Sequence, residues 1–218
     1  MTWKDYPQNI KVRLFTSFFN RTVTSAVMPF MALYFTHELN KVWAGLYLVF
    51  TVLISFLVNL FGGYLSDRYS RKNLLLISSS LSAIMFLFMT ISLVPNNHII
   101  WLFSTAYIVF IISSSIGRPA MNAIIIDSTT AENRKLVYSI DYWLVNLSMA
   151  IGTALGGLLY SNHKLLLFIL LTFTSTMLPI AYKIWLLEEN AIRLEKQKNH
   201  VILDLIQNYK TALQDQPF

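Results

Sequence analysis

The chain contains no cysteine, and only 13% of its 218 residues are charged. An average soluble domain has roughly 25% charged residues. The absence of cysteine excludes disulfides, thiolate metal sites and cysteine-dependent catalysis. The low charge, together with 55% hydrophobic residues, excludes an intrinsically disordered chain. The sequence is therefore expected to fold in surroundings that accept apolar surface.

The apolar residues come in blocks of about 20, the length that a transmembrane helix needs to cross roughly 30 Å of hydrocarbon. Six such blocks are present, and the short connections between them imply that consecutive helices run antiparallel. The pattern therefore predicts an all-α membrane protein with six transmembrane helices. The predicted helices cover residues 12–35, 43–66, 73–94, 99–126, 136–160 and 165–187.

Basic residues predict the orientation of these helices, because cytoplasmic loops carry an excess of Lys and Arg. Of the 17 basic residues, all but four lie before the first helix, in the second or fourth connection, or at or after the end of the sixth helix. Arg13 is counted with the residues before the first helix. Lys41 and Lys164 lie on the other side, and Arg21 and Arg118 fall inside predicted helices. Both termini are therefore predicted to lie in the cytoplasm, with the chain in the cell membrane, and the net charge of +6 requires no nucleic-acid partner.

Residues 188–218 differ from the rest because they are charged and repeat apolar residues at helical spacing. A cytoplasmic amphipathic helix near the membrane surface and a solvated linker helix both fit this pattern. We expect two regions: a six-helix unit over residues 1–187, and a cytoplasmic linker over residues 188–218 that leads towards a second half. The apolar stripe consists of Ile192, Val201, Ile202, Leu205, Ile206, Tyr209 and Leu213.

The segment after the second predicted helix reads G-G-Y-L-S-D-R-Y-S-R-K-N-L-L over residues 62–75. It resembles the signature loop of the major facilitator superfamily, G-x-L-[A/S]-D-R-x-G-R-[KR]-x-x-L, with Ser70 in place of the usual glycine. A generic basic cytoplasmic loop is the simpler alternative. The matching positions are Gly63, Leu65, Ser66, Asp67, Arg68, Arg71, Lys72 and Leu75.

The acid of this loop needs a partner, because an unpaired carboxylate at the membrane boundary is costly. Arg71 lies four residues after Asp67 and is the nearest candidate. The resemblance also implies that Asp67 faces the positive end of a helix in a second half, and that Asp127 joins the same charge cluster. The conformational gating motif is thus expected to contain Gly63, Asp67, Arg68, Arg71, Lys72 and Asp127.

A second resemblance covers residues 118–157, which are similar to helices four and five of bacterial drug-efflux members. Those members often carry G-P-x-x-G-G in helix five, where this chain has G-T-A-L-G-G and lacks the proline. Gly152, Gly156 and Gly157 are also expected to pack helices against each other. The resemblance extends over the whole chain and corresponds to the first six helices, in a 3+3 repeat, of a protein that normally has twelve.

Charged residues at membrane depth usually face a water-filled cavity or a partner. Arg21, Arg118 and Asp141 fall inside helices one, four and five, whereas helices three and six carry no interior charge. The resemblance implies that helices one, two, four and five surround a cavity and that three and six face lipid. A structural pair of Asp141 with Arg118 is an alternative. The candidates for cavity, substrate or proton contacts are Asn20, Arg21, Arg118, Asp141, Tyr142 and Asn146.

The expected function is that of the N-terminal half of a secondary active transporter, working by alternating access as proton-coupled, multidrug-type efflux. The alternatives are a six-helix half-transporter acting as a homodimer, or a truncated product without transport. The end at Phe218 is expected to interrupt a longer protein, so a C-terminal six-helix half is the expected partner.

No enzyme activity, cofactor or metal is expected. The predicted helices contain no histidine and no G-x-S-x-G sequence, and the four histidines fall in loops or the tail without metal-site spacing. The substrate stays open. Asp141 is the only acid at membrane depth and would suit a cationic drug, whereas the two arginines suit an anionic substrate at least as well.

Overall fold

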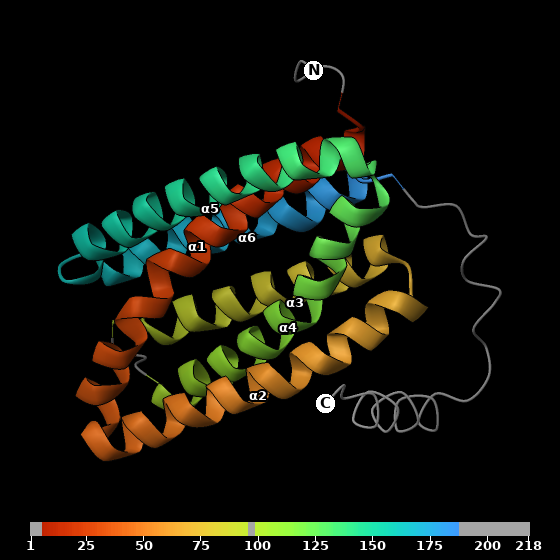
Figure 1. The fold of residues 1–218 in the computed structure, drawn as a ribbon. Helices are drawn as coiled ribbons and strands as arrows, with labels where there is room; N and C mark the ends of the chain where they lie inside the picture. The colour runs from red at the N-terminus through yellow and green to blue at the C-terminus, as the bar shows by residue number, and fades with distance from the viewer. Residues whose placement is uncertain (1–5, 96–98, 188–218) are drawn as a thin grey trace, which may run out of the picture. The chain divides into compact units, whose positions relative to one another are not determined.

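The helices begin and end close to the predicted blocks in a computed structural model that describes residues 6–95 and 99–187 (Figure 1). The all-helical prediction is therefore confirmed for the described residues. The largest difference is the earlier start of the fifth helix, at Ala131. The tail helix predicted over residues 188–218 lies outside the described residues. The elements are α1 Gln8–Leu39, α2 Lys41–Arg68, α3 Arg71–Ser92, α4 Ile100–Asp127, α5 Ala131–Tyr160 and α6 Lys164–Trp185.

Five of the described helices, α2 to α6, are long and apolar enough to cross a membrane. The first helix does not reach this level of hydropathy, because Arg13, Asn20 and Arg21 interrupt its apolar sequence. The prediction of six apolar spans is therefore confirmed for five of the six. Polar residues in α1 are accommodated by its position, since it packs against α2, α5 and α6 and also touches α4.

Apart from α3 and α4, helices that are neighbours in the sequence are not the main packing partners. α1 packs along α5, α2 packs along α4, and α3 packs against both α4 and α6 (Figure 1). If the chain is divided into the triplets α1–α3 and α4–α6, the first helix of each triplet packs against the second helix of the other. This exchange is the arrangement expected of a 3+3 repeat.

Glycines permit the closest approaches in both exchanged pairs. A Cβ atom added at Gly62 on α2 would lie 3.2 Å from the backbone of Ile116 on α4. A Cβ atom added at Gly152 on α5 would lie 2.8 Å from the Cβ of Ser25 on α1, and Gly156, one turn later, faces Ala26 of α1. Small residues therefore set the helix–helix distance in both pairs.

We expect Gly156→Ala to lower the free energy of unfolding by about 1–3 kcal/mol, because its new methyl group would meet the Ala26 carbonyl oxygen. Gly157→Ala is the matched control, because a Cβ there would meet only Phe30, at 3.9 Å. Alanine favours the helix over glycine by about 1 kcal/mol, so the control should be neutral or slightly stabilising. Equilibrium unfolding in detergent micelles measures both, and equal effects of the two substitutions would contradict the packing argument.

Aromatic side chains fill the space between α1 and α4 at one end. The rings of Tyr34 and Phe103 have centroids 4.1 Å apart, and those of Phe35 and Tyr47 are 4.4 Å apart. Phe168 of α6 adds to this cluster, with its ring centroid 5.5 Å from that of Phe103. Tyr34 and Phe35 lie in the second half of α1 and Phe103 lies in the first half of α4, while Tyr47 comes from α2, so packed rings close this end of the α1–α4 space.

Candidate functional site

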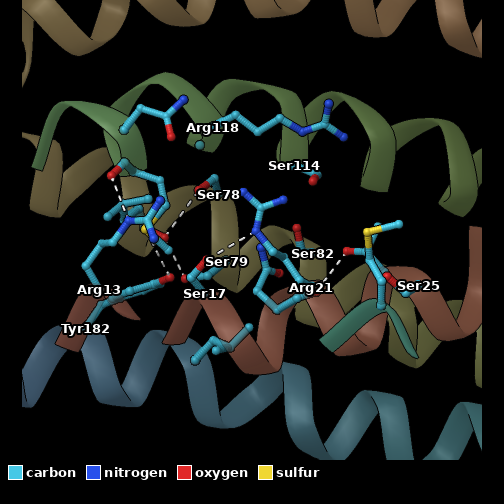
Figure 2. A pocket seen from close by; sticks show the side chains of 18 residues that line it. Arg13, Ser17, Arg21, Ser25, Ser78, Ser79, Ser82, Ser114, Arg118 and Tyr182 are labelled. Carbon is cyan, nitrogen blue, oxygen red and sulfur yellow. Dashed lines mark hydrogen bonds between the residues drawn. The ribbon is translucent and has the colours of Figure 1, made fainter. Parts of the chain in front are cut away.

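A cavity of about 360 Å³ lies beside the other halves of α1 and α4 (Figure 2). Its α1 lining extends from Arg13 to Ser25, and its α4 lining extends from Ser114 to Asn122. The third helix contributes Ser78, Ser79 and Ser82. Many of the side chains that line the cavity are therefore polar or charged, although the surrounding helices are mostly apolar.

The most buried charged side chain of the cavity is Arg13, which is only 1% exposed. Its guanidinium contacts both carboxylate oxygens of Asp141 on α5, with 3.2 Å between Nη2 and Oδ2. Its Nε donates a hydrogen bond of 3.3 Å to the carbonyl oxygen of Met121 on α4. One guanidinium thus joins α1, α4 and α5, and it satisfies a carboxylate that would be costly to bury alone.

The partner of Asp141 is therefore Arg13 and not Arg118, the pairing considered from the sequence. The sequence places Arg13 at the cytoplasmic flank, because it comes directly after the predicted start of the first helix at residue 12. In the structure α1 begins at Gln8, so Arg13 lies more than one turn inside the helix. An available signal was its spacing of three residues from Ile10, which is fully buried. An arginine on the same buried face requires a buried counter-charge.

Arg21 and Arg118 also line the cavity, as does Asn20. The Nε of Arg21 donates a hydrogen bond of 3.3 Å to the Oγ of Ser17, one turn earlier. Arg118 makes no hydrogen bond or ion pair with any residue in the described ranges. Figure 2 shows Arg21 extending from α1 and Arg118 extending along α4 over the same pocket. Neither guanidinium forms an ion pair in this part of the chain, although the carboxylate of Asp141 is near enough to act on the charge of Arg21.

The remaining cavity candidates lie on α5. Tyr142 is 68% exposed, and the side-chain amide of Asn146 donates a hydrogen bond of 2.8 Å to the Tyr142 carbonyl oxygen. Neither residue lines the cavity, and Asp141 reaches it through Arg13. The expectation that helices three and six lie outside needs correction, since Ser78 of α3 and Tyr182 of α6 both line the cavity. Helices α3 and α6 reach it because α1 and α4 contact each other little.

The signature loop places a second ion pair where α3 begins and α4 ends. Arg71 of α3 pairs with Asp127 of α4, with side chains that are 12% and 15% exposed. Asp67, expected to pair with Arg71, is exposed and makes no ion pair or hydrogen bond with the described residues. The loop acid is therefore available to a partner outside the described part of the chain.

The other residues of the predicted gating motif are Gly63, Arg68 and Lys72. Arg68 donates a hydrogen bond of 2.8 Å from Nη1 to the Tyr64 hydroxyl oxygen, and Lys72 is the second residue of α3. A Cβ atom added at Gly63 would meet nothing within 4 Å. Ser70 has a φ of −56° at the start of α3, so a serine is accommodated where the family usually has glycine.

Comparison with known proteins identifies relatives over the whole chain. Residues 13–218 match the family model of the Major Facilitator Superfamily. The chain is 29% identical over 231 aligned positions to a Na(+), Li(+), K(+)/H(+) antiporter of Planococcus maritimus, covering 100% of this chain and 53% of that protein. It is 35% identical over 105 positions to the Multidrug resistance protein MdtG of Dickeya zeae, covering 45% of this chain and 24% of that relative.

A solved structure shows the same fold. A peptide transporter, POT, in complex with sulfate aligns with a TM-score of 0.74 and 14% identity, over 98% of this chain and 44% of that one. This chain spans about half the length of the Planococcus antiporter, at 53%. The relatives carry the names of transporters and not of enzymes. With nearly all of its residues matched by the family model, the chain belongs to the Major Facilitator Superfamily.

Proposed function

We propose that this chain is the N-terminal six-helix half of a secondary active transporter that moves a small molecule across the cytoplasmic membrane by alternating access. The observation that carries the proposal is the arginine-lined cavity in a bundle of which five helices, α2 to α6, are long and apolar enough to span a membrane. In transporters, the substrate site lies near the bilayer midplane between repeats that rock against each other. A cavity closed by packed aromatic rings at one end supplies one wall of such a site.

The need for a second half is supported by the apolar surface of α2 and α5. Trp43 and Phe56 on α2 are each 62% exposed, and Trp143 and Leu158 on α5 are each 74% exposed. Few residues of these two helices are buried. Because the chain covers 53% of the Planococcus antiporter, we propose that a C-terminal six-helix half covers part of this surface, and that residues 188–218 link the two halves.

Proton coupling is proposed to act through Asp141. This carboxylate is 9% exposed and is linked to the cavity by Arg13. Protonation of Asp141 would remove the counter-charge of Arg13 and change the charge of the cavity by one unit. A proton and a charged substrate would then influence each other's binding at this site. The printed names of the relatives, a cation/proton antiporter and a multidrug resistance protein, favour exchange of a monovalent cation or a drug for protons.

Orientation and gating belong to the same proposal. The excess of basic residues supports a cytoplasmic location for both termini, which would put the Arg71–Asp127 pair and Asp67 at the cytoplasmic end of the bundle. Asp67 would meet the positive end of a helix from the second half when the cytoplasmic side closes.

In a transporter completed with the C-terminal six-helix half, Asp67→Asn should reduce pH-gradient-driven flux at least tenfold. The substitution removes the charge that is proposed to meet the second half. The thermal stability of the six-helix half should hardly change, since Asp67 has no partner there. Flux into inverted vesicles, for Na+, K+ and a panel of drugs, measures the effect. Glu132→Gln, which removes an exposed acid from the first turn of α5, is the matched control.

Full flux in Asp67→Asn would remove the gating role of the loop acid. A completed, correctly inserted protein that moves none of these solutes, whatever the pH gradient, would overturn the proposed antiport.

A further inference from the structure

Positive charges outnumber negative ones among the described residues that line the cavity. Three guanidiniums line the cavity, and no described Asp or Glu is among the lining residues. Asp141, behind the wall on α5, compensates Arg13 through a two-point contact. Arg21 and Arg118 are left as two positive charges on facing sides of the same space, one on α1 and one on α4.

Both arginines lie deep along their helices. Arg21 is about 20 Å along α1 from Gln8, and Arg118 is about 14 Å from the end of α4, at a rise of 1.5 Å per residue. A charged side chain at such depth costs at least about 2.5 kcal/mol unless a partner or water covers it. Two guanidiniums in one cavity, neither of them in an ion pair with a described acid, therefore indicate a site that holds water or an anion.

Further hydrogen-bond donors remain unused around the two arginines. The amides of Asn20 and Asn122 and the hydroxyl of Ser114 line the cavity, and their side chains make no hydrogen bond within the described part of the chain. Guanidiniums bind carboxylate, phosphate and sulfate groups through paired hydrogen bonds. The donor set is thus complementary to an oxyanion and repels a cation.

We propose that Arg21 and Arg118 bind an oxyanion: a phosphate, sulfate or carboxylate group carried by a small molecule. As a transport site, this inference rests on the function proposed above, whereas binding itself can be measured without transport. A cationic substrate would bind away from these two arginines or on the second half. The same chemistry could come from the phosphate of a membrane lipid, so the test separates the two sources.

The experiment titrates the purified 218-residue chain in neutral detergent with sulfate, phosphate and succinate at constant ionic strength, and follows its thermal unfolding temperature and its intrinsic fluorescence. A saturable rise with oxyanions and none with chloride supports the proposal. Arg118→Gln and Arg21→Gln should each weaken binding about 10- to 100-fold, the loss expected for a charge-assisted hydrogen-bond pair. Arg118→Lys, which keeps the charge but not the paired donors, should retain intermediate affinity.

The matched control is Lys135→Gln, which removes an exposed positive charge on the first turns of α5. It should bind as the unmodified chain does. A parallel titration with micelles containing phosphatidylglycerol or phosphatidylcholine tests the lipid source. If only phosphatidylglycerol shifts the unfolding temperature and both Gln substitutions abolish the shift, the oxyanion is a lipid headgroup.

Absence of any oxyanion effect, an effect that survives both Gln substitutions, or an equal loss in Lys135→Gln would overturn the proposal. So would saturable binding of Na+ or tetraphenylphosphonium that depends on Arg21 and Arg118. A chain that binds oxyanions but never transports would leave the site intact and refute only the transport proposal.

Discussion

Asp141→Asn should lower the free energy of unfolding by about 3–5 kcal/mol, the usual cost of removing one partner of a buried ion pair. The substitution leaves the guanidinium of Arg13, which is 1% exposed, without its counter-charge. It also loosens the Arg13 contacts that tie α1 to both α4 and α5. Equilibrium unfolding of the purified chain in detergent micelles measures the loss.

A double substitution distinguishes an unpaired charge from a simple loss of packing. Arg13→Met with Asp141→Leu removes both charges and keeps apolar volume, so it should recover most of the stability lost in Asp141→Asn. Glu132→Gln, an exposed acid on the same helix, is the control and should change stability by less than about 0.5 kcal/mol. A double variant as unstable as the sum of its single variants would show that the pair does not act as a unit.

The 218-residue chain alone should insert into vesicles but give no substrate flux. Alternating access needs two halves that close against each other on alternate sides, and the proposed function makes this chain only one of them. Co-expression with a matching C-terminal half should restore flux, because the apolar faces of α2 and α5 remain available for assembly. Flux into vesicles with an imposed pH gradient, compared with and without the second half, is the measurement.

Transport without a second half would contradict this prediction. Proton-coupled transport by the purified chain alone would show that two copies can complete the cavity, and the homodimer would become the leading interpretation. Crosslinking in the same vesicles would then have to detect a dimer. Restoration of flux only by the separate C-terminal half would instead identify the chain as one half of a carrier.

Length and hydropathy predicted the helices well, because a membrane helix needs a long apolar block and leaves one in the sequence. The loop motif identified the family, and Asp127, expected to join the charge cluster of the loop, pairs with Arg71. The Arg71–Asp127 pair itself could not be predicted from the sequence. Asp67 lies only four residues from Arg71, so the spacing favoured Asp67 as the partner, whereas Arg71 pairs with a carboxylate from another helix. Short-range spacing is a weak guide wherever helices cross.

The contact of Arg13 with Asp141 was missed for a related reason. The two residues are 128 positions apart, and a basic residue near a helix start is usually cytoplasmic. Only the packing of α1 along α5, set by Gly152 and Gly156, brings them together. The participation of α3 and α6 in the cavity has no sequence signal, because the serines of α3 are ordinary in an apolar helix.

The distance between Arg13 and Asp141 along the chain also bears on the order in which the protein is made. Each arginine costs about 2.5–3.5 kcal/mol when a helix passes from the translocon into lipid, and α1 is the described helix that lacks the hydropathy to offset this. The counter-charge of Arg13 is Asp141, which is synthesised 128 residues later. The delay is roughly 6–25 s at 5–20 residues per second. Although α1 is synthesised before α5, it is expected to settle only after α5 arrives, and to stay beside the translocon or the polar headgroups until then.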